Sequence, residues 1–502
     1  MNRIMPLLLL GTSLAPAVII FCLADDSRRT RTAVNIVGAL LKLALVAVML
    51  EGVRSGEAYE FRHALLPGLD LVLRADALAL LFLTLSAFLW LLTTIYAIAY
   101  FGESADLSRF FGFFSLCVAA TTGVALAGSL VTFFVFYELL TLATWPLVAH
   151  KGKEDSIAAG RKYLRYTMCG SAALLAGIVF LESKVGPIEF TARGMLDDVT
   201  AFDLRVAFAL LIGGLAVKAA IVPLHGWLPA AMVAPAPVSA LLHAVAVVKA
   251  GAFGIVRVIY DVYGFALVDS IGVGLPLAVL AAITIVYGSL KALLQSDIKR
   301  RLAYSTISQI SYIVLGATLL GSMATIGGLV HLVHQGLMKI TLFFCAGALA
   351  ERAGVTRVDQ LDGIALRMPI TMAAFTIAAL GMIGVPPVAG FISKWHLGVG
   401  AVQAGQNWAL FALAASSLLN AAYFLPLLVR AWLHPLADPD STRPPAGDEG
   451  PGWLIAPAAI TAAVALGAGL FAAFVYSPLG WATLIVETEY PFLDAQPGGS
   501  TP

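Results

Sequence analysis

The chain has 502 residues, of which 60% are hydrophobic and only 12% are charged, and its mean hydropathy is +0.90. Soluble domains carry about 25% charged residues, so this composition excludes a water-soluble enzyme, a disordered chain and a nucleic-acid-binding protein. The 31 basic and 30 acidic residues nearly balance, which gives no sign of an anionic partner and leaves a protein embedded in the lipid bilayer.

About 14 stretches of the chain are long enough to cross a membrane, which takes roughly 20 apolar residues each. The first, residues 4–23, is too long for the apolar part of a signal peptide and is followed by a basic turn instead of a cleavage site. The further predicted spans are 33–50, 76–100, 109–128, 129–149, 161–182, 205–228, 234–260, 270–294, 302–320, 324–350, 367–400, 407–433 and 452–476. Residues 51–75 form the longest predicted loop, and 437–451 is a predicted linker. The sequence therefore predicts an all-α polytopic membrane protein.

Basic residues are distributed unequally between the two sets of connections. The odd-numbered connections hold 18 lysines and arginines, whereas the even-numbered connections and the termini hold 7. Cytoplasmic loops carry the excess of basic residues, so both termini are expected on the non-cytoplasmic side of the cell's inner (plasma) membrane.

The other 6 basic residues lie inside predicted spans: Lys42, Lys218, Lys249, Arg257, Lys339 and Lys394. A lysine or arginine at the centre of a membrane helix costs about 2.5–3.5 kcal/mol on insertion scales. Lys42 and Arg257 stand near helix ends, where we expect them to extend their charged groups to the membrane surface. Lys218, Lys249 and Lys394 have long apolar runs on both sides, which favours a functional role over the alternative of structural ion pairs.

Glu138 is the carboxylate that the sequence places at mid-membrane. A carboxyl group there stays protonated unless a cation lies nearby, so we expect an ion pair between Glu138 and a buried lysine. A third charge that approaches such a pair changes the proton affinity of the lysine, which is the physical basis of a proton relay. A static salt bridge between two helices is the alternative.

Two predicted spans contain helix-breaking residues. Pro223 follows Lys218 by 5 residues, and Pro386 and Pro387 precede Lys394. Non-helical backbone at membrane depth persists only where it lines a cavity or packs on protein. Broken helices in corresponding halves are typical of inverted-repeat transporters. We therefore predict helices 1–3 in residues 1–108, two inverted five-helix repeats in 109–263 and 264–434, and a linker with the last helix in 435–502.

The eleventh predicted span carries His331, His334 and Lys339. The two histidines share one helix face, with Lys339 about 80° round from His331. Imidazoles titrate near neutral pH and could link the two lysine-bearing halves, although hydrogen bonds to neighbouring helices are the alternative. His243, six residues before Lys249, is a further candidate. Neither the histidines nor the four cysteines (Cys22, Cys117, Cys169 and Cys345) show metal-ligand spacing, so no metal or cofactor is expected.

The segment KAAIVPLHGWLPAAMVAPAPVSALLHAVAVVKAG, residues 218–251, resembles the core of the proton-conducting antiporter-type membrane subunits. That family comprises the L, M and N subunits of respiratory complex I, related hydrogenase subunits, and the A and D subunits of Mrp-type Na⁺/H⁺ antiporters. The resemblance covers predicted spans 4 to 13 and implies a fold with two inverted five-helix repeats. It also implies Glu138 and Lys218 as a modulating ion pair, Lys249 as the central relay, His331, His334 and Lys339 as a bridge, and Lys394 as the terminal proton-exchanging group.

Within the family, long C-terminal extensions are usual in the L and A types, and the M type typically has a glutamate at the position of Lys394. We therefore favour a D-type subunit of a multi-subunit Na⁺/H⁺ antiporter, with other membrane subunits, protons and Na⁺ as partners. The motifs at Leu224–Trp227 and Leu242–Ala244 look closer to the A, L and hydrogenase types. A proton-pumping M- or N-like subunit of a complex I-like NADH-quinone oxidoreductase or membrane hydrogenase is the main alternative, and a secondary transporter for an organic solute is the third.

Overall fold

The computed structural model describes residues 2–66, 69–102, 104, 106–190, 196–435 and 449–491. Most of these residues are helical, and the predicted multi-pass helical membrane protein is confirmed at that level. Residues 437–448 of the predicted linker lie outside the described part of the chain.

The N-terminal part contains three long helices and one β-hairpin. Its elements are α1 (Met5–Phe21), α2 (Arg28–Arg54), β1 (Tyr59–Leu66), β2 (Leu69–Ala75) and α3 (Ala77–Phe101). The two strands pair antiparallel within the segment that the sequence predicts as a loop. Arg62 and Arg74 extend from the hairpin to Glu189, with N–O distances of 2.7 and 3.0 Å. Partial burial favours a higher pKa for Glu189, but hydrogen bonds from the two guanidinium groups outweigh it and hold the pKa below its ordinary value.

The next part of the chain contains the first predicted helix break. Its elements are α4 (Leu107–Leu126), α5 (Leu130–Val148), α6 (Glu154–Val185), α7 (Ala201–Lys218), α8 (Trp227–Ala230), the 3₁₀ turn η1 (Ala231–Val233), α9 (Ala236–Ala240), the π-helix η2 (Leu241–Val245), α10 (Val247–Arg257), the π-helix η3 (Val258–Tyr263) and α11 (Phe265–Ser270). Helix α7 ends at Lys218, and the backbone is non-helical until α8 begins at Trp227. The break thus places a lysine at the C-terminal end of a helix inside the membrane domain.

The rest of the chain contains the second break. Its elements are α12 (Gly274–Leu293), α13 (Ile298–Thr318), α14 (Ser322–Ala353), the 3₁₀ turns η4 (Val358–Gln360) and η5 (Ile364–Leu366), α15 (Pro369–Ile383), α16 (Ala389–Gln403), α17 (Trp408–Leu433), α18 (Gly452–Leu470) and α19 (Pro478–Glu489). The span predicted over 367–400 is divided by the Gly/Pro cluster into α15 and α16. Helix α19 has no counterpart among the predicted spans.

Ten helices of the described chain are long and apolar enough to cross a membrane, compared with the predicted number of about 14. Several of the other predicted spans are interrupted or charged. Helices α1 and α15 are apolar but shorter, and α7 contains Asp203, Arg205 and Lys218 within 18 residues. The difference therefore lies mainly in helices that carry breaks or charges.

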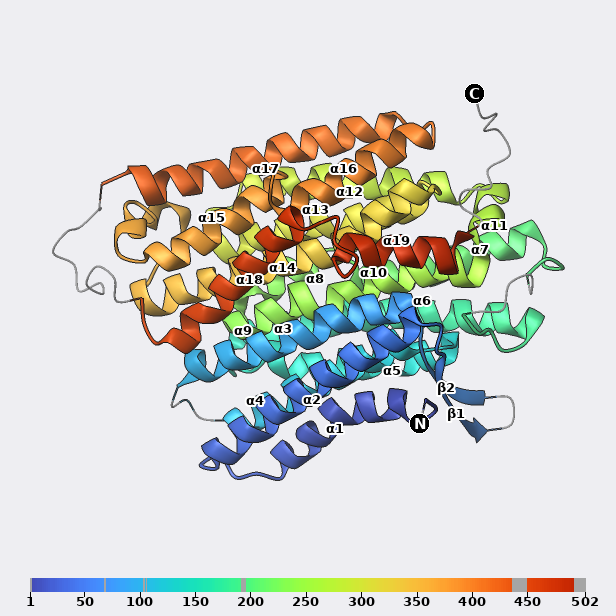
Figure 1. The fold of residues 1–502 in the computed structure, drawn as a ribbon, viewed down its shortest axis with the longest axis horizontal. Helices are drawn as coiled ribbons and strands as arrows, with labels where there is room; N and C mark the ends of the chain where they lie inside the picture. The colour runs from blue at the N-terminus through green and yellow to red at the C-terminus, as the bar shows by residue number, and fades with distance from the viewer. Residues whose placement is uncertain are drawn as a thin grey trace.

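The helices lie side by side, with α1 and α2 at one edge of the molecule and α17 at the opposite edge (Figure 1). Helix α14 packs against α13, α15, α16 and α18. The apolar stretches of Ser322–Ala353 and Ala236–Tyr263 are completely buried, so the two segments with most of the predicted site residues form the centre of the protein.

The last helix is attached to the start of the third. Glu489 on α19 accepts a hydrogen bond of 2.6 Å from the backbone N–H of Ala77, and the Trp481 indole donates one of 2.9 Å to the Ala77 carbonyl. These contacts bring α19 beside α3 and α14. Residues separated by more than 400 positions in the sequence thus meet at the end of α3 next to the hairpin.

Candidate functional site

Buried lysines form a row through the centre of the molecule. Lys218, Lys249 and Lys339 are each at most 1% exposed, whereas Glu138 and Lys394 are half-buried. The helices that carry the lysines pack in turn, with α7 against α10, α10 against α13, α13 against α14, and α14 against α16. The row therefore runs from helix to helix across the bundle, and its two ends are its more accessible members.

The predicted ion pair between Glu138 and Lys218 is not formed within the described part of the chain. Instead, the Lys218 ammonium lies 3.3 Å from the centroid of the Tyr137 ring and donates a hydrogen bond to the Tyr137 carbonyl. Glu138 accepts a hydrogen bond from the Ser171 hydroxyl. Neighbouring residues of a helix point about 100° apart, so a lysine that contacts Tyr137 does not also face the Glu138 side chain.

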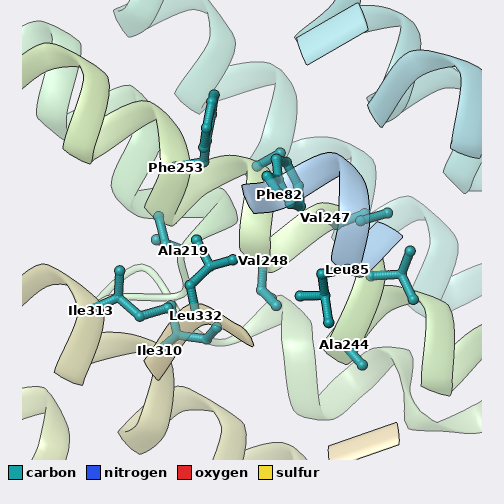
Figure 2. Close-up of a cluster of buried hydrophobic side chains, with 14 of the residues drawn as sticks. Phe82, Leu85, Ala219, Ala244, Val247, Val248, Phe253, Ile310, Ile313 and Leu332 are labelled. Carbon is teal, nitrogen blue, oxygen red and sulfur yellow. The ribbon is translucent and has the colours of Figure 1, made fainter. Parts of the chain in front are cut away.

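Lys249 links α10 to the histidine-bearing helix. Its Nζ donates a hydrogen bond of 2.5 Å to the carbonyl of Leu332, the residue that follows His331. Figure 2 shows the apolar residues between these helices, with Val248 and Leu332 in one cluster with Ala219. The amine is thus surrounded by hydrocarbon, where its charge depends strongly on the few polar groups it contacts.

Gly251 allows α10 to approach the break after α7. A Cβ atom at this position would lie 2.8 Å from the carbonyl carbon of Lys218 and still closer to the amide nitrogen of Ala219. Real Cβ atoms do not approach backbone that closely, so glycine permits the contact. This close packing brings the helix of Lys249 to the helix end of Lys218.

The histidines on α14 have different surroundings. His331 shares a hydrogen bond of 2.8 Å between its Nδ1 and the Ser393 hydroxyl and stacks on Tyr312 with ring centroids 5.0 Å apart. Both ring nitrogens of His334 lack a hydrogen-bond partner within the described residues. The same holds for His243 in η2, whose ring lies 4.6 Å from that of Phe343. Of the three, His331 therefore has a direct link to the helix of Lys394.

A chain of hydrogen bonds connects Lys339 to α17. The Lys339 ammonium donates to the Ser305 hydroxyl at 2.6 Å, and Ser305 lies 2.7 Å from the Tyr423 hydroxyl. Tyr423 in turn donates to the side-chain oxygen of Asn420. The Asn420 amide then donates to the carbonyl of Met382, at 3.0 Å.

Lys394 is bound by the end of the second broken helix. Its Nζ donates hydrogen bonds of 2.9 Å to the carbonyls of both Met382 and Ile383 and one of 3.1 Å to Ser417. The last carbonyls of a helix have no partner within it and carry partial negative charge, so they suit an ammonium group. Asn420 also donates to the Met382 carbonyl. The hydrogen-bond chain that begins at Lys339 therefore ends at the same carbonyl oxygen that accepts a hydrogen bond from Lys394.

Sequence reasoning did not identify Ser305, Asn420 or Tyr423. The sequence does contain a pattern that could have identified the residues of α17. Ser416, Asn420 and Tyr423 are spaced by four and three residues and so form one polar face of an apolar helix. The matching polar face of α13 includes Ser305, Ser308 and Tyr312. Which helix each face meets depends on tertiary packing.

Two charged residues differ from the sequence-based interpretation. Arg257 is 2% exposed and forms ion pairs with Asp76 at 2.7 Å and Asp261 at 2.8 Å. Lys42 is completely buried and donates to the Thr122 hydroxyl. The interpretation that both extend to the membrane surface is wrong, because packed neighbours enclose both side chains and Lys42 lies at the middle of α2 instead of near a helix end.

The comparison with known families matches the region that contains Glu138 and the lysine row. Residues 127–420 match the family described as the NADH:quinone oxidoreductase/Mrp antiporter transmembrane family. The chain belongs to this family. The matched region extends from α5 to α17 and includes Glu138, Lys218, Lys249, Lys339 and Lys394.

Similar proteins come from both branches of the family. NADH-quinone oxidoreductase subunit N of Desulforudis audaxviator is 37% identical over 417 residues, which cover 80% of this chain and 81% of that protein. An A-type Na⁺/H⁺ antiporter subunit of Alkalihalophilus pseudofirmus is 32% identical over 354 residues, which cover 65% of this chain but only 42% of that longer protein. A chain of the solved Mrp complex from Dietzia sp. DQ12-45-1b superimposes with a TM-score of 0.84 at 25% identity, over 97% of this chain and 99% of that one.

Proposed function

We propose that the chain is the proton-translocating membrane subunit of a multi-subunit monovalent cation (Na⁺)/H⁺ antiporter. The observation that carries this proposal is the contact sequence from Lys339 through Ser305, Tyr423 and Asn420 to the carbonyl that also binds Lys394. Amines, hydroxyls and imidazoles exchange protons, and a buried row of them is the kind of arrangement found in membrane proton relays.

In this proposal Lys249 is the central proton-exchanging group. A proton released by its ammonium is accepted by His331, beside the carbonyl that holds Lys249, and His331 passes it toward Lys394 through Ser393. Lys339 exchanges protons with the Ser305 and Tyr423 hydroxyls as a second branch, and Asn420 joins this branch by hydrogen bonds to the helix end that holds Lys394. Movement of the Lys218 ammonium between Tyr137 and Glu138 changes the charge near Lys249 and so sets when the proton leaves.

A second candidate function is a proton-pumping subunit of a complex I-like NADH-quinone oxidoreductase. The relative named subunit N favours it, because its 37% identity extends over 81% of that protein. The same relay serves both functions, and the difference lies in whether Na⁺ gradients or electron transfer by partner subunits drives it. The partners in either case are other membrane subunits.

We also propose that residues 109–263 and 264–434 form two inverted repeats. Each contains a broken helix that ends near a lysine of the row, Lys218 in the first and Lys394 in the second. The proposed orientation places both ends of the chain outside the cytoplasm. Asn2 contacts Glu57 beside the hairpin, and Glu489 contacts Ala77 at the same end of the bundle, which supports a common side for the two termini.

The test uses the whole complex in sealed vesicles with a pH-sensitive dye. Lys249→Met should abolish proton flux, and Glu138→Gln should lower it strongly, because each removes a charge from the row. Lys184→Met is the matched control, since Lys184 lies at the end of α6 with its side chain 43% exposed. A Na⁺ gradient should drive the flux in the antiporter, whereas dependence on NADH and quinone instead would establish the second candidate. Undiminished flux in Lys249→Met would refute both.

A further inference from the structure

A cavity of about 540 Å³ lies away from the lysine row, between α2, α3, α14, α18 and α19. Its walls are almost entirely apolar and include Leu43 and Leu50 of α2, Leu85 and Phe88 of α3, and Val333 and Leu337 of α14. Polar side chains occur mainly toward the loop between α18 and α19, at Tyr476 and Ser477. The cavity is therefore apolar inside and polar at one end.

The cavity extends part of the way through one membrane leaflet. Its lining residues on α2 are Leu43 and Leu50, which are separated by 7 residues, or about 10 Å at 1.5 Å per residue. The hydrocarbon of a bilayer is about 30 Å thick, so one leaflet contributes about 15 Å. An extended acyl chain that entered from the polar end would run along α2 to the floor of the cavity.

Cavities of this size and apolar character match those that hold small ligands. The shape thus favours a single flexible hydrocarbon chain.

One cation and one anion lie beside the polar end of the cavity, both in contact with Tyr476 of its lining. The guanidinium carbon of Arg54 lies 4.6 Å from the centroid of the Tyr476 ring, and the Tyr476 hydroxyl donates to Glu51 at 3.3 Å. Among the described residues neither Arg54 nor Glu51 forms an ion pair. The exposed aromatic side chains of Phe471, Phe474 and Tyr476 surround this end, as is usual at the level of lipid headgroups.

We propose that this cavity is a binding site for one zwitterionic aminophospholipid, of the phosphatidylethanolamine class. One acyl chain occupies the cavity, the phosphate binds Arg54, and the primary ammonium binds Glu51. An anionic lipid would bring a further negative charge toward Glu51 and toward Glu487, which lines the neighbouring cavity with Arg54. Charge complementarity therefore selects the zwitterion.

The bound acyl chain would contact α14, the helix of His331 and His334, on the face that lines the cavity. Val333 and Leu337 line the cavity on either side of His334 in the sequence, and Leu85 of the same cavity packs against Gly336. The lipid would therefore support this turn of α14. The site goes beyond the proposed transport function, and binding can be measured without flux.

The experiment reconstitutes the whole complex in phosphatidylcholine vesicles that contain a phosphatidylethanolamine with a photoreactive diazirine on its acyl chain. Mass spectrometry should locate the cross-links on peptides of α2, α3, α14 and α18 that line the cavity. Phosphatidylglycerol with the same diazirine chain should label these peptides several-fold less. Equal labelling by the two lipids would overturn the choice of headgroup, and cross-links only to the outer surfaces of the helices would overturn the site.

Two variants test the geometry. A Cβ at Gly467, which lines the cavity, meets no atom within 4 Å, so Gly467→Phe can fill the cavity without displacing backbone and should remove the labelling. Ala463→Phe, on the exposed face of the same helix, is the control and should leave it intact. Arg54→Gln should weaken labelling by about 10-fold, because a charge-assisted hydrogen bond is lost. Full labelling in Gly467→Phe, or cross-links from the cavity to a partner subunit in place of lipid, would contradict the proposal.

Discussion

Ser305 on α13 and Tyr423 on α17 share a hydrogen bond of 2.7 Å, and this contact joins Lys339 to the helix break that holds Lys394. Tyr423 donates its only hydroxyl proton to Asn420, so the Ser305 hydroxyl is the donor to Tyr423. Lys339 in turn donates to Ser305. Every hydrogen bond of the chain therefore points away from Lys339, an orientation that fits a charged lysine. A neutral Lys339 can accept from Ser305, and the hydrogen bonds between Lys339, Ser305 and Tyr423 could then reverse, whereas the Asn420 amide can only donate to the Met382 carbonyl.

Tyr423→Phe tests whether this chain carries protons. The variant keeps the ring but removes the hydroxyl, which separates Ser305 from Asn420. We expect proton flux to fall by roughly 10-fold, the effect of losing one buried hydrogen bond, while the complex still assembles. Dye-monitored flux in vesicles measures it.

Tyr96→Phe is the control for Tyr423→Phe. The Tyr96 hydroxyl is equally buried and donates to the Phe344 carbonyl at 3.0 Å, away from the lysine row. Its loss should leave flux nearly unchanged. Equal flux in the two variants would exclude the chain from the path.

Gly251→Ala tests the contact between α10 and the break after α7. The added methyl group has no room beside Lys218 and Ala219, and overpacking of this kind costs about 1–3 kcal/mol. We expect α10, which carries Lys249, to move away from the end of α7. Proton flux should then fall strongly, while the thermal stability of the complex should fall only slightly. Gly213→Ala on α7, where a Cβ meets nothing within 4 Å, should behave like the wild type. Normal flux in Gly251→Ala would show that the close approach is dispensable.

Arg257→Gln tests the buried ion pairs at the hairpin end of the bundle. The substitution leaves Asp76 and Asp261 without their cation, and breaking a buried pair typically destabilises by about 3–5 kcal/mol. The half-life of the complex at raised temperature should shorten sharply. Arg62→Gln removes a guanidinium that is 42% exposed, for which about 1 kcal/mol or less is expected. If both variants were equally stable, the Arg257 cluster would not hold the fold together.

Lys42→Met tests whether a buried lysine outside the row is dispensable for proton flux, unlike the lysines within the row. Lys42 contacts Thr122 and lies 5.4 Å from the centroid of the Trp90 ring, with no carboxylate in ion-pair range among the described residues. A buried charge without a counter-ion is costly, and methionine has a similar shape. The variant should be at least as heat-stable as the wild type and should retain its flux. A loss of flux would bring Lys42 into the proton path.

The positions of the lysine row could be predicted from the sequence because a charge within a long apolar run is conspicuous. Lys218, Lys249 and Lys339 are buried as their apolar neighbours indicate. Proline likewise marked both helix breaks, since it removes a backbone hydrogen bond wherever it stands. These are local properties of the chain.

The contacts of the row could not be predicted in the same way. Lys218 binds Tyr137 instead of Glu138 because the rotation of α5 decides which of the two adjacent side chains faces α7. Arg257 meets Asp76, 181 residues away in the sequence, and no local pattern relates them. The sequence alone also left the hairpin and α19 unrecognised, because short strands and a 12-residue helix give little apolar signal.

The attachment of α19 to Ala77 has a consequence for biosynthesis. Both backbone groups of Ala77 are bound by side chains that the ribosome adds 404 and 412 residues later. At a synthesis rate of roughly 5–20 residues per second, the first turn of α3 waits roughly 20–80 s for these partners. During that interval the side of α3 that α19 later covers is exposed to lipid and to nascent partner subunits. The sequence separation of these contacts therefore determines that α19 docks on α3 only at the end of synthesis.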